Sequence, residues 1–464
     1  MIPPRLEGLL AADGVPMRVA AQFAEAGHEV WLVGGSVRDA LLGRDRSDAE
    51  FDFTTRARPD EIEKLLSGFA AAVVTVGKAF GTIGGMVDGV PIEATTFRSE
   101  VYRDDSRKPS VEFSDNLEED LSRRDFTVNA MALRLLPEPE IIDPHDGLVD
   151  LGAAVLRTPL DPDISFGDDP LRMLRLFRFA STLGFAPDPE AIEAAAAMSQ
   201  RLSIISAERI RDELDRVIMG EHVVAALQGI VDTGLADVFL PELPALAVAQ
   251  DPIHHHKDVL SHTLAVVSQC PADRITRLAA LFHDVGKPHT RDFGPGGVSF
   301  HHHEVVGARM TKARLKALRY SKDDVEAVSR LVYLHMRPHT FKMGWTDRAV
   351  RRYVRDAGDL LGRLNDLVRS DVTTRNRKKE RQIQRRIDEL EERIADLRAR
   401  EEIDAIRPPI DGNRVMEILE VSPGPWVGEA MDFLLEHRLD HGPYSEEEAE
   451  TLLREWFEAN LPGD

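Results

Sequence analysis

Two acidic residues close together in an apolar stretch are the first group of side chains that could take part in catalysis or metal binding. Glu50 and Asp52 are separated by Phe51, and Asp48 precedes them in the same phase. Residues two apart on a strand point to the same face. Clustered carboxylates repel one another unless a cation lies among them, and oxygen ligands shared with phosphate groups suit Mg²⁺. The pattern favours a Mg²⁺ site, with a solvated acidic strand face as the alternative.

A third acid and a glycine pair strengthen the first interpretation. Glu93 lies in the apolar run from Val90 to Phe97, where an unpaired carboxylate is costly. Gly34 and Gly35 lie between an apolar strand predicted at 29–33 and a helix predicted from about residue 37. Backbone N–H groups at such a turn are free to receive a triphosphate. A tight strand-to-helix turn without a ligand is the alternative for the glycine pair alone.

A second group of residues combines imidazoles and carboxylates over about a hundred positions. They follow in the order His262, His283-Asp284, His303, His335 and Asp371. Imidazole with carboxylate suits Mn²⁺, Fe²⁺, Ni²⁺ or Zn²⁺. A helix directs neighbouring side chains about 100° apart, so His283 and Asp284 are expected to reach one ion only across a cleft. The other histidines, such as His301 and His302, are expected in solvated loops.

The hydrophobic pattern predicts the elements that position these groups. Strands are expected at 29–33, 51–54, 72–76, 81–87 and 91–97, alternating with helices, and from about residue 168 the pattern is helical, as in 171–179 and 208–219. Boundaries are expected at the proline-rich stretches near 158–162 and 241–252. The charged segment 375–402 has apolar residues at four- and three-residue steps and predicts a coiled-coil hairpin arm or a tail helix.

Composition narrows the class of protein further. The 80 Asp plus Glu exceed the 58 Lys plus Arg, giving a net charge of −22, which disfavours a generally basic nucleic-acid coat but allows a local basic groove. The length of 464 residues allows several domains. A single cysteine, Cys270, cannot form an intramolecular disulfide, and neither a signal peptide nor a membrane span is recognisable. A cytoplasmic protein is expected.

Two basic runs are candidates for contact with RNA. The first is a helical stripe that contains Arg348, Arg351, Arg352 and Arg355, and the second extends from Arg375 to Arg386. A solvated helix face balanced by nearby glutamates is the alternative for both. RNA contact through them predicts a narrow basic track and an affinity that falls with added salt.

The order of motifs carries a resemblance to a known family. The run Leu32-Val33-Gly34-Gly35-Ser36-Val37-Arg38-Asp39, followed by Glu50-Phe51-Asp52, resembles the head of the tRNA nucleotidyltransferase and poly(A) polymerase family of the polymerase-β-like superfamily. Further matches are Arg123-Arg124-Asp125-Phe126-Thr127-Val128-Asn129, Asp143-Pro144-His145-Asp146-Gly147 and Asp168-Asp169-Pro170-Leu171-Arg172. The resemblance implies an α+β fold, in which a small mixed-sheet head precedes an all-α neck, body and tail.

The resemblance also implies roles for single residues. Glu50, Asp52 and Glu93 would hold two Mg²⁺ ions and form the catalytic group, although the family has Asp at the position of Glu50. Asp169 and Arg172, three apart on a helix, would present a Watson–Crick-like edge that selects CTP or ATP without a template. The remaining candidate nucleotide contacts are Gly34, Gly35, Arg38, Arg124, Asn129, Arg175 and Arg178, with Lys78 as the weakest candidate.

The histidine and aspartate series resembles the HD metal-dependent phosphohydrolases. This resemblance implies a metal at His262, His283, Asp284 and Asp371, with His303 and His335 as ligands of a second metal, and Mn²⁺ or Ni²⁺ as suitable ions. The expected domains are a catalytic head at 1–160, a base-reading neck and RNA-binding region at 161–250, an HD domain at 251–375 and a helical arm and tail at 376–464.

Three functions remain open on these motifs. The first is addition of CMP and AMP from CTP and ATP to the 3′ end of tRNA, with an HD hydrolase activity beside it. The second, in the same superfamily, is a poly(A) polymerase or an enzyme that adds only part of CCA. The third is an HD phosphohydrolase whose head has degenerated into an RNA-binding module, which only the unusual Glu50 favours.

Overall fold

The computed structural model describes residues 2–44, 50–101, 110–248, 258–294, 297–340, 345–372, 377–401, 403 and 406–460. Asp48 and Arg375, named above as candidates, lie outside these residues. The chain divides into two compact units, the first made of residues 1–244 with 317–319 and the second of residues 245–316 with 320–464. No helix among the described residues is long and apolar enough to cross a membrane.

The first unit is built on a seven-stranded mixed sheet with the order β3-β4-β5-β2-β1-β8-β9. The strands are β1 (Val30–Val33), β2 (Phe51–Thr55), β3 (Ala72–Val74), β4 (Thr82–Val87), β5 (Val90–Thr96), β8 (Ala132–Arg134) and β9 (Glu140–Ile142). Only β2 and β5 pair in parallel, and every other neighbouring pair is antiparallel. The expected strands at 29–33, 51–54, 72–76, 81–87 and 91–97 are present with slightly different ends.

One face of this sheet forms the core of the unit, and the other carries the acids. Helices α1 (Val15–Glu25) and α3 (Pro59–Phe69) bury residues such as Phe23 and Leu66 against the sheet residues Phe53, Ile83 and Ile92. Burial of each large apolar side chain stabilises the fold by roughly 1.5 to 3 kcal/mol. Because side chains alternate between faces, Asp52 and Glu93 point away from this core.

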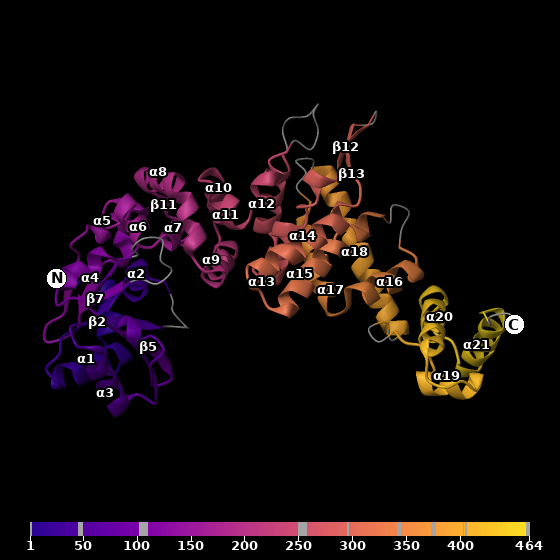
Figure 1. Cartoon of the computed structure of the whole chain (residues 1–464), viewed down its shortest axis with the longest axis horizontal. Helices are drawn as coiled ribbons and strands as arrows, with labels where there is room; N and C mark the ends of the chain where they lie inside the picture. Colours follow the sequence, from indigo (N-terminus) through magenta and orange to yellow (C-terminus); the bar gives the residue numbers. More distant parts are fainter. Residues whose placement is uncertain are drawn as a thin grey trace. The chain divides into compact units, whose positions relative to one another are not determined.

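Short helices and small strands complete the first unit, as the labels in Figure 1 allow the reader to follow. They are α2 (Gly35–Leu42), β6 (Arg98–Val101), β7 (Ser110–Phe113), α4 (Leu117–Ser122), α5 (Gly147–Ala153), β10 (Val155–Leu156), α6 (Pro162–Asp168), α7 (Leu171–Leu183), β11 (Ala186–Pro187), α8 (Pro189–Met198), α9 (Ala207–Met219), α10 (Val223–Asp232) and α11 (Leu235–Phe239). Helix α7 packs against α9 and α10.

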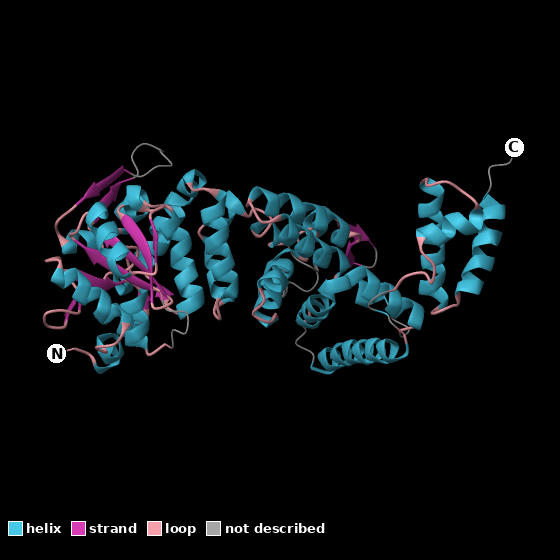
Figure 2. Cartoon of the chain, turned by 90° about the horizontal axis from the view of Figure 1, so that it is seen from below, coloured by secondary structure: helices cyan, strands magenta, loops and turns pink. Residues whose placement is uncertain are grey.

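The second unit is almost entirely helical (Figure 2), with one short hairpin. Its elements are α12 (Val259–Gln269), α13 (Arg274–Phe282), β12 (Arg291–Gly294), β13 (Gly297–Phe300), α14 (His303–Ala317), α15 (Lys322–Leu334), α16 (Asp347–Ala357), α17 (Leu361–Ser370), α18 (Arg377–Arg400), α19 (Gly412–Leu419), α20 (Pro425–His441) and α21 (Glu446–Asn460). The last three helices share a separate apolar cluster that contains Val415, Leu434 and Leu453.

Helix α18 is one continuous helix, so the expected hairpin within this segment was wrong, whereas its assignment to the tail stays a prediction. Its apolar stripe, including Leu390 and Leu397, is buried, and the helix packs against α16 and α17. Arg369 of α17 also forms an ion pair with Glu391 of α18 at 2.6 Å. The spacing was read correctly as one apolar face, but a single sequence does not reveal which surface covers that face.

The structure also corrects the RNA contact predicted for Arg351. This arginine is only 5% exposed, and its guanidinium pairs with the buried carboxylate of Glu401 at 2.9 Å and donates to the carbonyl oxygen of Leu439. Its charge is therefore used inside the protein. Arg352 and Arg355 are partly exposed and pair with Glu436, so their contact with RNA stays a prediction.

Replacement of Arg351 by alanine should destabilise the second unit without a specific loss of RNA affinity. Glu401 would keep its ion pair with Arg438 at 3.0 Å, but it would lose both hydrogen bonds from Arg351, and hydrogen bonds to charged groups contribute about 1.5 to 3 kcal/mol. Chemical denaturation would measure the free energy of unfolding. The control is Arg348→Ala, since Arg348 pairs with Asp440 at 2.8 Å but is 59% exposed and should cost little. Equal effects of the two substitutions would contradict a structural role for Arg351.

Candidate active site and metal centre

The three predicted carboxylates meet on the open face of the sheet. The parallel pairing of β2 with β5 places Asp52 opposite Glu93, and one oxygen each of Glu50, Asp52 and Glu93 lies within 4.8 Å of the others. Partial burial raises the pKa of Glu93, and the charges of Asp52 and Glu50 raise it further. This repulsion is what a divalent cation would relieve, so the donor set fits a hard cation.

Glu50 reaches this cluster from a position just before β2. Its backbone carbonyl accepts a hydrogen bond from the hydroxyl of Ser36 at 3.1 Å, which ties the start of the strand to α2. A glutamate carboxylate lies roughly one bond length, about 1.5 Å, farther from its backbone than that of aspartate. The longer side chain of Glu50 therefore still reaches Asp52 and Glu93, at a position where an aspartate was expected from the resemblance.

Gly34 allows the backbone to pass close to the acids. It has a positive φ of 69°, which glycine adopts without strain. A Cβ atom built there would lie 3.5 Å from Oδ2 of Asp52 and 3.4 Å from Nη1 of Arg124. The turn between β1 and α2 thus places backbone next to both an acid and an arginine, as a triphosphate site requires.

A buried chain of hydrogen bonds orients the arginine side chains next to the three carboxylates. Asp125 pairs with Arg175 at 2.5 Å and accepts from the side-chain amide of Asn129 at 2.9 Å, while Asn129 accepts from Arg38 at 2.6 Å. The arginines lower the pKa of Asp125 even though burial opposes this. The aromatic ring of Phe179 lies under the guanidinium groups of Arg178 and Arg38, at 4.0 and 5.1 Å.

Two neighbouring cavities, each of about 360 Å³, surround this arrangement. The first is lined by residues that include Gly34, Gly35, Arg38, Asn129, Arg178 and Arg216. The second is lined by residues that include Glu93, Arg98, Arg123, Asp169, Arg172 and Arg209. Asp52, Arg124, Asp125 and Arg175 border both cavities, so the two cavities lie side by side.

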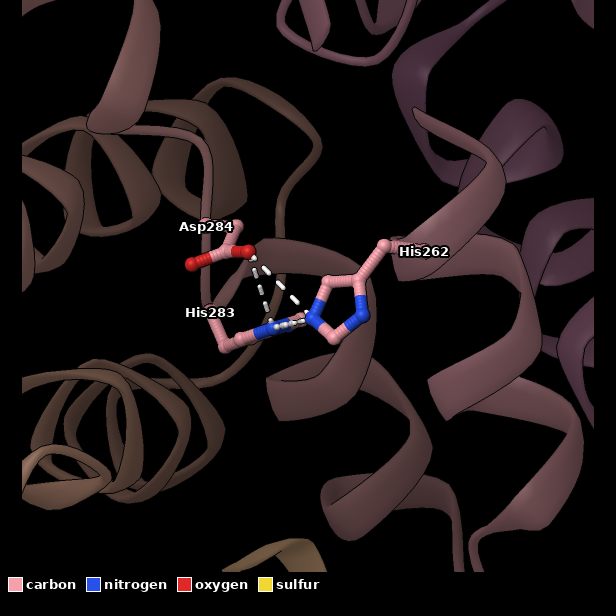
Figure 3. A group of neighbouring side chains, drawn as sticks. All are labelled: His262, His283 and Asp284. Atoms are coloured by element: carbon pink, nitrogen blue, oxygen red, sulfur yellow. Dashed lines mark hydrogen bonds and ion pairs between the residues drawn. The ribbon is translucent and has the colours of Figure 1, made fainter. Parts of the chain in front are cut away.

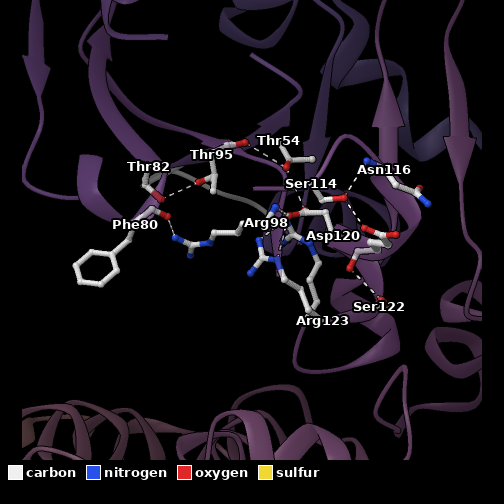
Figure 4. A network of polar contacts seen from close by, with 12 residues as sticks. Thr54, Phe80, Thr82, Thr95, Arg98, Ser114, Asn116, Asp120, Ser122 and Arg123 are labelled. Atoms are coloured by element: carbon white, nitrogen blue, oxygen red, sulfur yellow. Dashed lines mark hydrogen bonds and ion pairs between the residues drawn. The ribbon is translucent and has the colours of Figure 1, made fainter. Parts of the chain in front are cut away.

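A polar network links this region to the sheet (Figure 4). Asp120 is fully buried, and it accepts hydrogen bonds from the hydroxyl of Thr54 at 3.0 Å and from Arg123 at 2.6 Å. Burial alone would raise the pKa of Asp120, but Arg123 and Arg124 lower it. A charged Asp120 thus fixes two arginines next to the strand that carries Asp52.

Asp169 and Arg172 line the same cavity, but not as the predicted helical pair. Asp169 precedes α7, where it accepts from the N–H of Leu171, and its other oxygen pairs with Arg209 of α9 at 3.0 Å. Arg172 instead donates to the hydroxyl of Ser165 at 2.9 Å and to the carbonyl oxygen of Arg123. Both side chains are held by other residues, which makes a rigid edge.

Lys78, the weakest candidate for triphosphate contact, lies elsewhere. Its ammonium group pairs with Asp60 at 2.6 Å and with Glu63, and these contacts raise its pKa. It borders neither of the two cavities. The charge of Lys78 is therefore used in ion pairs outside the two cavities.

In the second unit, the histidine and aspartate series converges on one buried centre, of which Figure 3 shows His262, His283 and Asp284. Ligand atoms of His262, His283 and Asp284 lie within 4.8 Å of one another, as do those of Asp284, His303 and His335. Asp371 joins the first group, with its oxygen 2.9 Å from Nε2 of His262. His283 and Asp284 follow the end of α13, rather than lying within it, so both side chains turn toward the same point.

The surroundings of this centre prepare the imidazoles for metal binding. The Nδ1 atoms of His283, His303 and His335 lie 2.7, 2.8 and 2.6 Å from the backbone carbonyl oxygens of Ala280, Phe300 and Val332. These carbonyls orient the rings and direct Nε2 into the centre. Burial lowers the pKa of His335 to about 3, whereas Asp284 and Asp371 outweigh burial and raise the pKa of His283 to about 10. The donor set fits a divalent transition metal.

Several residues beside the acids were missed from the sequence. They are Arg98, Arg123, Asp120, Asp125, Phe179, Arg209 and Arg216. Asp125 and Arg123 flank Arg124 within the motif already recognised, so their position was a usable signal. Nothing in the local pattern marks Arg209 or Arg216, because they enter through the packing of α9 against α7.

Comparison with known families places three matches along the chain. Residues 30–157 match the poly A polymerase head domain, residues 184–246 the probable RNA and SrmB-binding site of polymerase A, and residues 259–394 the HD domain. The HD match extends into α18, in agreement with its packing against α17.

Individual relatives agree with these matches. An A-adding tRNA nucleotidyltransferase of Deinococcus radiodurans is 33% identical over 446 residues, covering 93% of this chain and 96% of that protein. The CCA-adding enzyme of Bacillus subtilis is 41% identical over 221 residues, which is 47% of this chain and about half, 53%, of that protein. The structure of the Bacillus stearothermophilus CCA-adding enzyme in complex with CTP has a TM-score of 0.67 at 24% identity and covers 99% of both chains.

The fold and the site together define the class of protein. A mixed sheet with three carboxylates beside an arginine-lined cavity is a nucleotidyltransferase of the polymerase-β-like class, here followed by an HD domain. The near full-length relative at 33% identity narrows this further. The chain belongs to the tRNA nucleotidyltransferase and poly(A) polymerase family.

Shortening Glu50 should impair the site, because the three carboxylates meet at the length of a glutamate. In Glu50→Asp the carboxylate withdraws by about 1.5 Å, and we expect incorporation of labelled CMP to fall at least about tenfold. The steady-state rate at saturating Mg²⁺ is the measurement. The control is Glu61→Asp, which shortens an exposed glutamate at the start of α3. A rate at or above that of the wild type in Glu50→Asp would contradict this account of the site.

Proposed function

We propose that the protein adds CMP and AMP, from CTP and ATP, to the 3′ end of tRNA to build or repair the CCA terminus. The observation that carries this proposal is that the carboxylates and the two residues expected to read the base, Asp169 and Arg172, lie in the same region. Two members of the carboxylate cluster, Asp52 and Glu93, line a cavity that Asp169 and Arg172 also line. A stretch of 221 residues, 47% of the chain, is 41% identical to a CCA-adding enzyme, which supports the proposal.

Divalent metal ions complete the nucleotidyltransferase site, and we propose Mg²⁺ held by Glu50, Asp52 and Glu93. When bound, Mg²⁺ activates the RNA 3′-hydroxyl and neutralises the leaving pyrophosphate. The protein itself positions the reactants. Arg38, Arg124 and Arg175, together with the backbone N–H groups at Gly34 and Gly35, bind the triphosphate and offset its charge.

Base selection is proposed to rest on a fixed protein edge instead of a template. Asp169 is held by Arg209, and Arg172 is held by Ser165 and by the backbone of Arg123. Acceptors and donors that cannot rotate freely discriminate better, because an unmatched base leaves a buried polar group without its partner. Arg178 has its pKa lowered to about 10 by burial and by Arg175, and it lines the neighbouring cavity.

Removal of the Asp169 carboxylate should therefore affect selectivity before catalysis. In Asp169→Ala we expect the preference for CTP over UTP to fall at least about tenfold, whereas the rate with saturating CTP falls less. The ratio of kcat/KM values for CTP and UTP is the measurement. Glu190→Ala, an exposed acid of α8, serves as the control and should change neither quantity. Unchanged CTP over UTP selectivity in Asp169→Ala would refute the role of this residue.

Addition of AMP alone is the second candidate function. The relative that aligns over nearly the whole chain is an A-adding tRNA nucleotidyltransferase. Single-turnover assays with tRNA lacking its last one, two or three nucleotides, and with CTP, ATP or both, separate the candidates. Complete CCA synthesis supports our proposal, extension only of tRNA ending in CC supports the second candidate, and a long adenosine tail would identify a poly(A) polymerase.

For the HD centre, we propose metal-dependent hydrolysis of a phosphoester, such as a 2′,3′-cyclic phosphate, with Mn²⁺ or Ni²⁺ as the ion. Six residues supply the donor set, and Asp284 belongs to both groups of ligands. When bound, the metal supplies an activated water. Lys287 lies beside the centre at 2.6 Å from Asp284 and provides a positive charge for the substrate phosphate.

Asp284→Ala should abolish this hydrolysis and remove metal, because it takes a ligand from both groups. The assays are hydrolysis of cytidine 2′,3′-cyclic phosphate with Mn²⁺ or Ni²⁺ and metal content by mass spectrometry. Nucleotide incorporation by the head should persist, and His289→Ala, outside the ligand groups, is the control. Equal hydrolysis by wild type and Asp284→Ala would remove the catalytic proposal.

The remaining proposals concern the rival function and the location. Incorporation of any labelled CMP or AMP by the wild type would exclude a degenerate head, since such a head binds RNA without transferring nucleotides. We also propose a cytoplasmic location, because the single cysteine of the chain, Cys270, is buried and has no second cysteine with which to form an intramolecular disulfide.

A further inference from the structure

The face of the sheet that carries the acids continues beyond them to the edge of the sheet. Glu93 of β5 is paired with Gly84 of β4, and Gly84 is paired with Val74 of β3. Residues directly opposite on neighbouring strands lie on the same face. A Cβ atom built on Gly84 would lie 3.4 Å from Cβ of Val74, which confirms the shared face. Because Gly84 has no side chain, the surface of the sheet between Glu93 and the edge strand β3 is bare at this position.

An exposed apolar strip borders this bare surface. The strip is formed by the side chains of Val74, Val76, Phe80 and Met86. These side chains are 54%, 89%, 46% and 36% exposed. Met86 lies two residues from Gly84 on the same strand and so shares its face, while Val76 and Phe80 lie in the connection between β3 and β4. Adjacent exposed apolar side chains mark a binding surface more often than isolated ones do.

The catalytic geometry gives this strip a place in the reaction. Gly34, Gly35 and Arg38 lie on the β1 and α2 side of Asp52, whereas the strip lies on the β4 and β3 side of Glu93. In phosphoryl transfer the attacking and leaving oxygens are roughly in line across the phosphorus. With the leaving pyrophosphate at the arginines, the attacking 3′-hydroxyl approaches from the side of the strip.

We propose that the apolar strip binds the unpaired terminal bases of the RNA acceptor, next to the carboxylates. This inference rests on the proposed nucleotidyltransferase function and names a binding site for its second substrate. Bases stack on aromatic and apolar side chains without regard to their identity, as the changing terminus of a growing CCA end demands. In Figure 4 the ring of Phe80 points away from the polar network, and this side chain is partly exposed.

The charge around the strip fits a nucleic acid. Arg98 borders the cavity with Glu93, and its guanidinium donates to the carbonyl oxygen of Phe80, so a positive charge lies at the inner end of the strip. Arg58 lies 5.6 Å from the ring centre of Phe113, whose ring packs next to Gly81, and its charge is shared with Asp115 at 3.0 Å. Apolar side chains for bases with arginines for phosphates are the combination that binds single strands.

Kinetic constants of strip variants test the proposal on the full-length protein. For Val76→Asp and Phe80→Ala we expect KM for tRNA ending in CC to rise roughly fivefold to a hundredfold, the effect of losing one stacked base. KM for ATP and kcat at saturating tRNA should stay within about twofold of the wild type, as expected when only acceptor binding is lost. Phe80→Trp should restore the KM for tRNA, because it retains an aromatic surface.

The matched control is Val149→Asp, which places the same charge on a 66% exposed valine of α5 outside both cavities. Its KM for tRNA should equal that of the wild type. An unchanged KM for tRNA in both strip variants would overturn the proposal. The proposal would also be overturned if Val76→Asp abolished self-association or binding to another protein while the tRNA kinetics stayed unchanged.

A binding measurement separates this proposal from the proposed function. Hydrogen exchange of residues 72–87 is compared with and without tRNA ending in a 3′-deoxynucleotide, which cannot be extended. Protection of these residues supports the strip as an RNA site even if the wild type incorporated no nucleotide, the outcome that would refute the proposed function. Unchanged exchange at 72–87 while the RNA is bound elsewhere on the protein would overturn the inference.

Discussion

The parallel pairing of β2 with β5 is the constraint on which the active site depends. It places Asp52 opposite Glu93, with Glu50 close by, so three like charges gather on one face. Such a cluster is unfavourable by itself, as the raised pKa of Glu93 indicates. The neighbouring features compensate for it: Gly34 admits backbone close to Asp52, while Asp120 and Asp125 hold arginines at the border of the acids.

The HD centre of the second unit solves a related problem with different groups. Asp284 is buried among histidines, and His283 and Lys287 lower its pKa although burial opposes this, while backbone carbonyls fix three of the imidazole rings. Both centres therefore hold their ligands before any metal binds, which reduces the cost of ordering them on binding. The excess of acids in the chain, −22 overall, is in part the chemistry of these two centres.

The sequence was sufficient for the parts of the site that obey local periodicity or a motif. The period of two predicted the shared face of Glu50 and Asp52, and the order of motifs placed Glu93 and the HD residues. Contacts between elements that are distant along the chain could not be predicted from the sequence. Arg209 reaches Asp169 from another helix, Arg351 is neutralised by Glu401, and the apolar stripe of α18 is covered by its neighbours. Periodicity shows that a face is buried, but not what covers it.

The most direct test of the central claim is a crystal structure of the protein with Mn²⁺ and a non-hydrolysable CTP analogue. Anomalous scattering locates the metal without assumptions about its ligands. The account predicts Mn²⁺ within bonding distance of carboxylate oxygens of Glu50, Asp52 and Glu93, with the triphosphate against Arg38 and Arg124. Absence of Mn²⁺ from this cluster while the nucleotide is bound, or a metal held without Glu50 and Glu93, would contradict it.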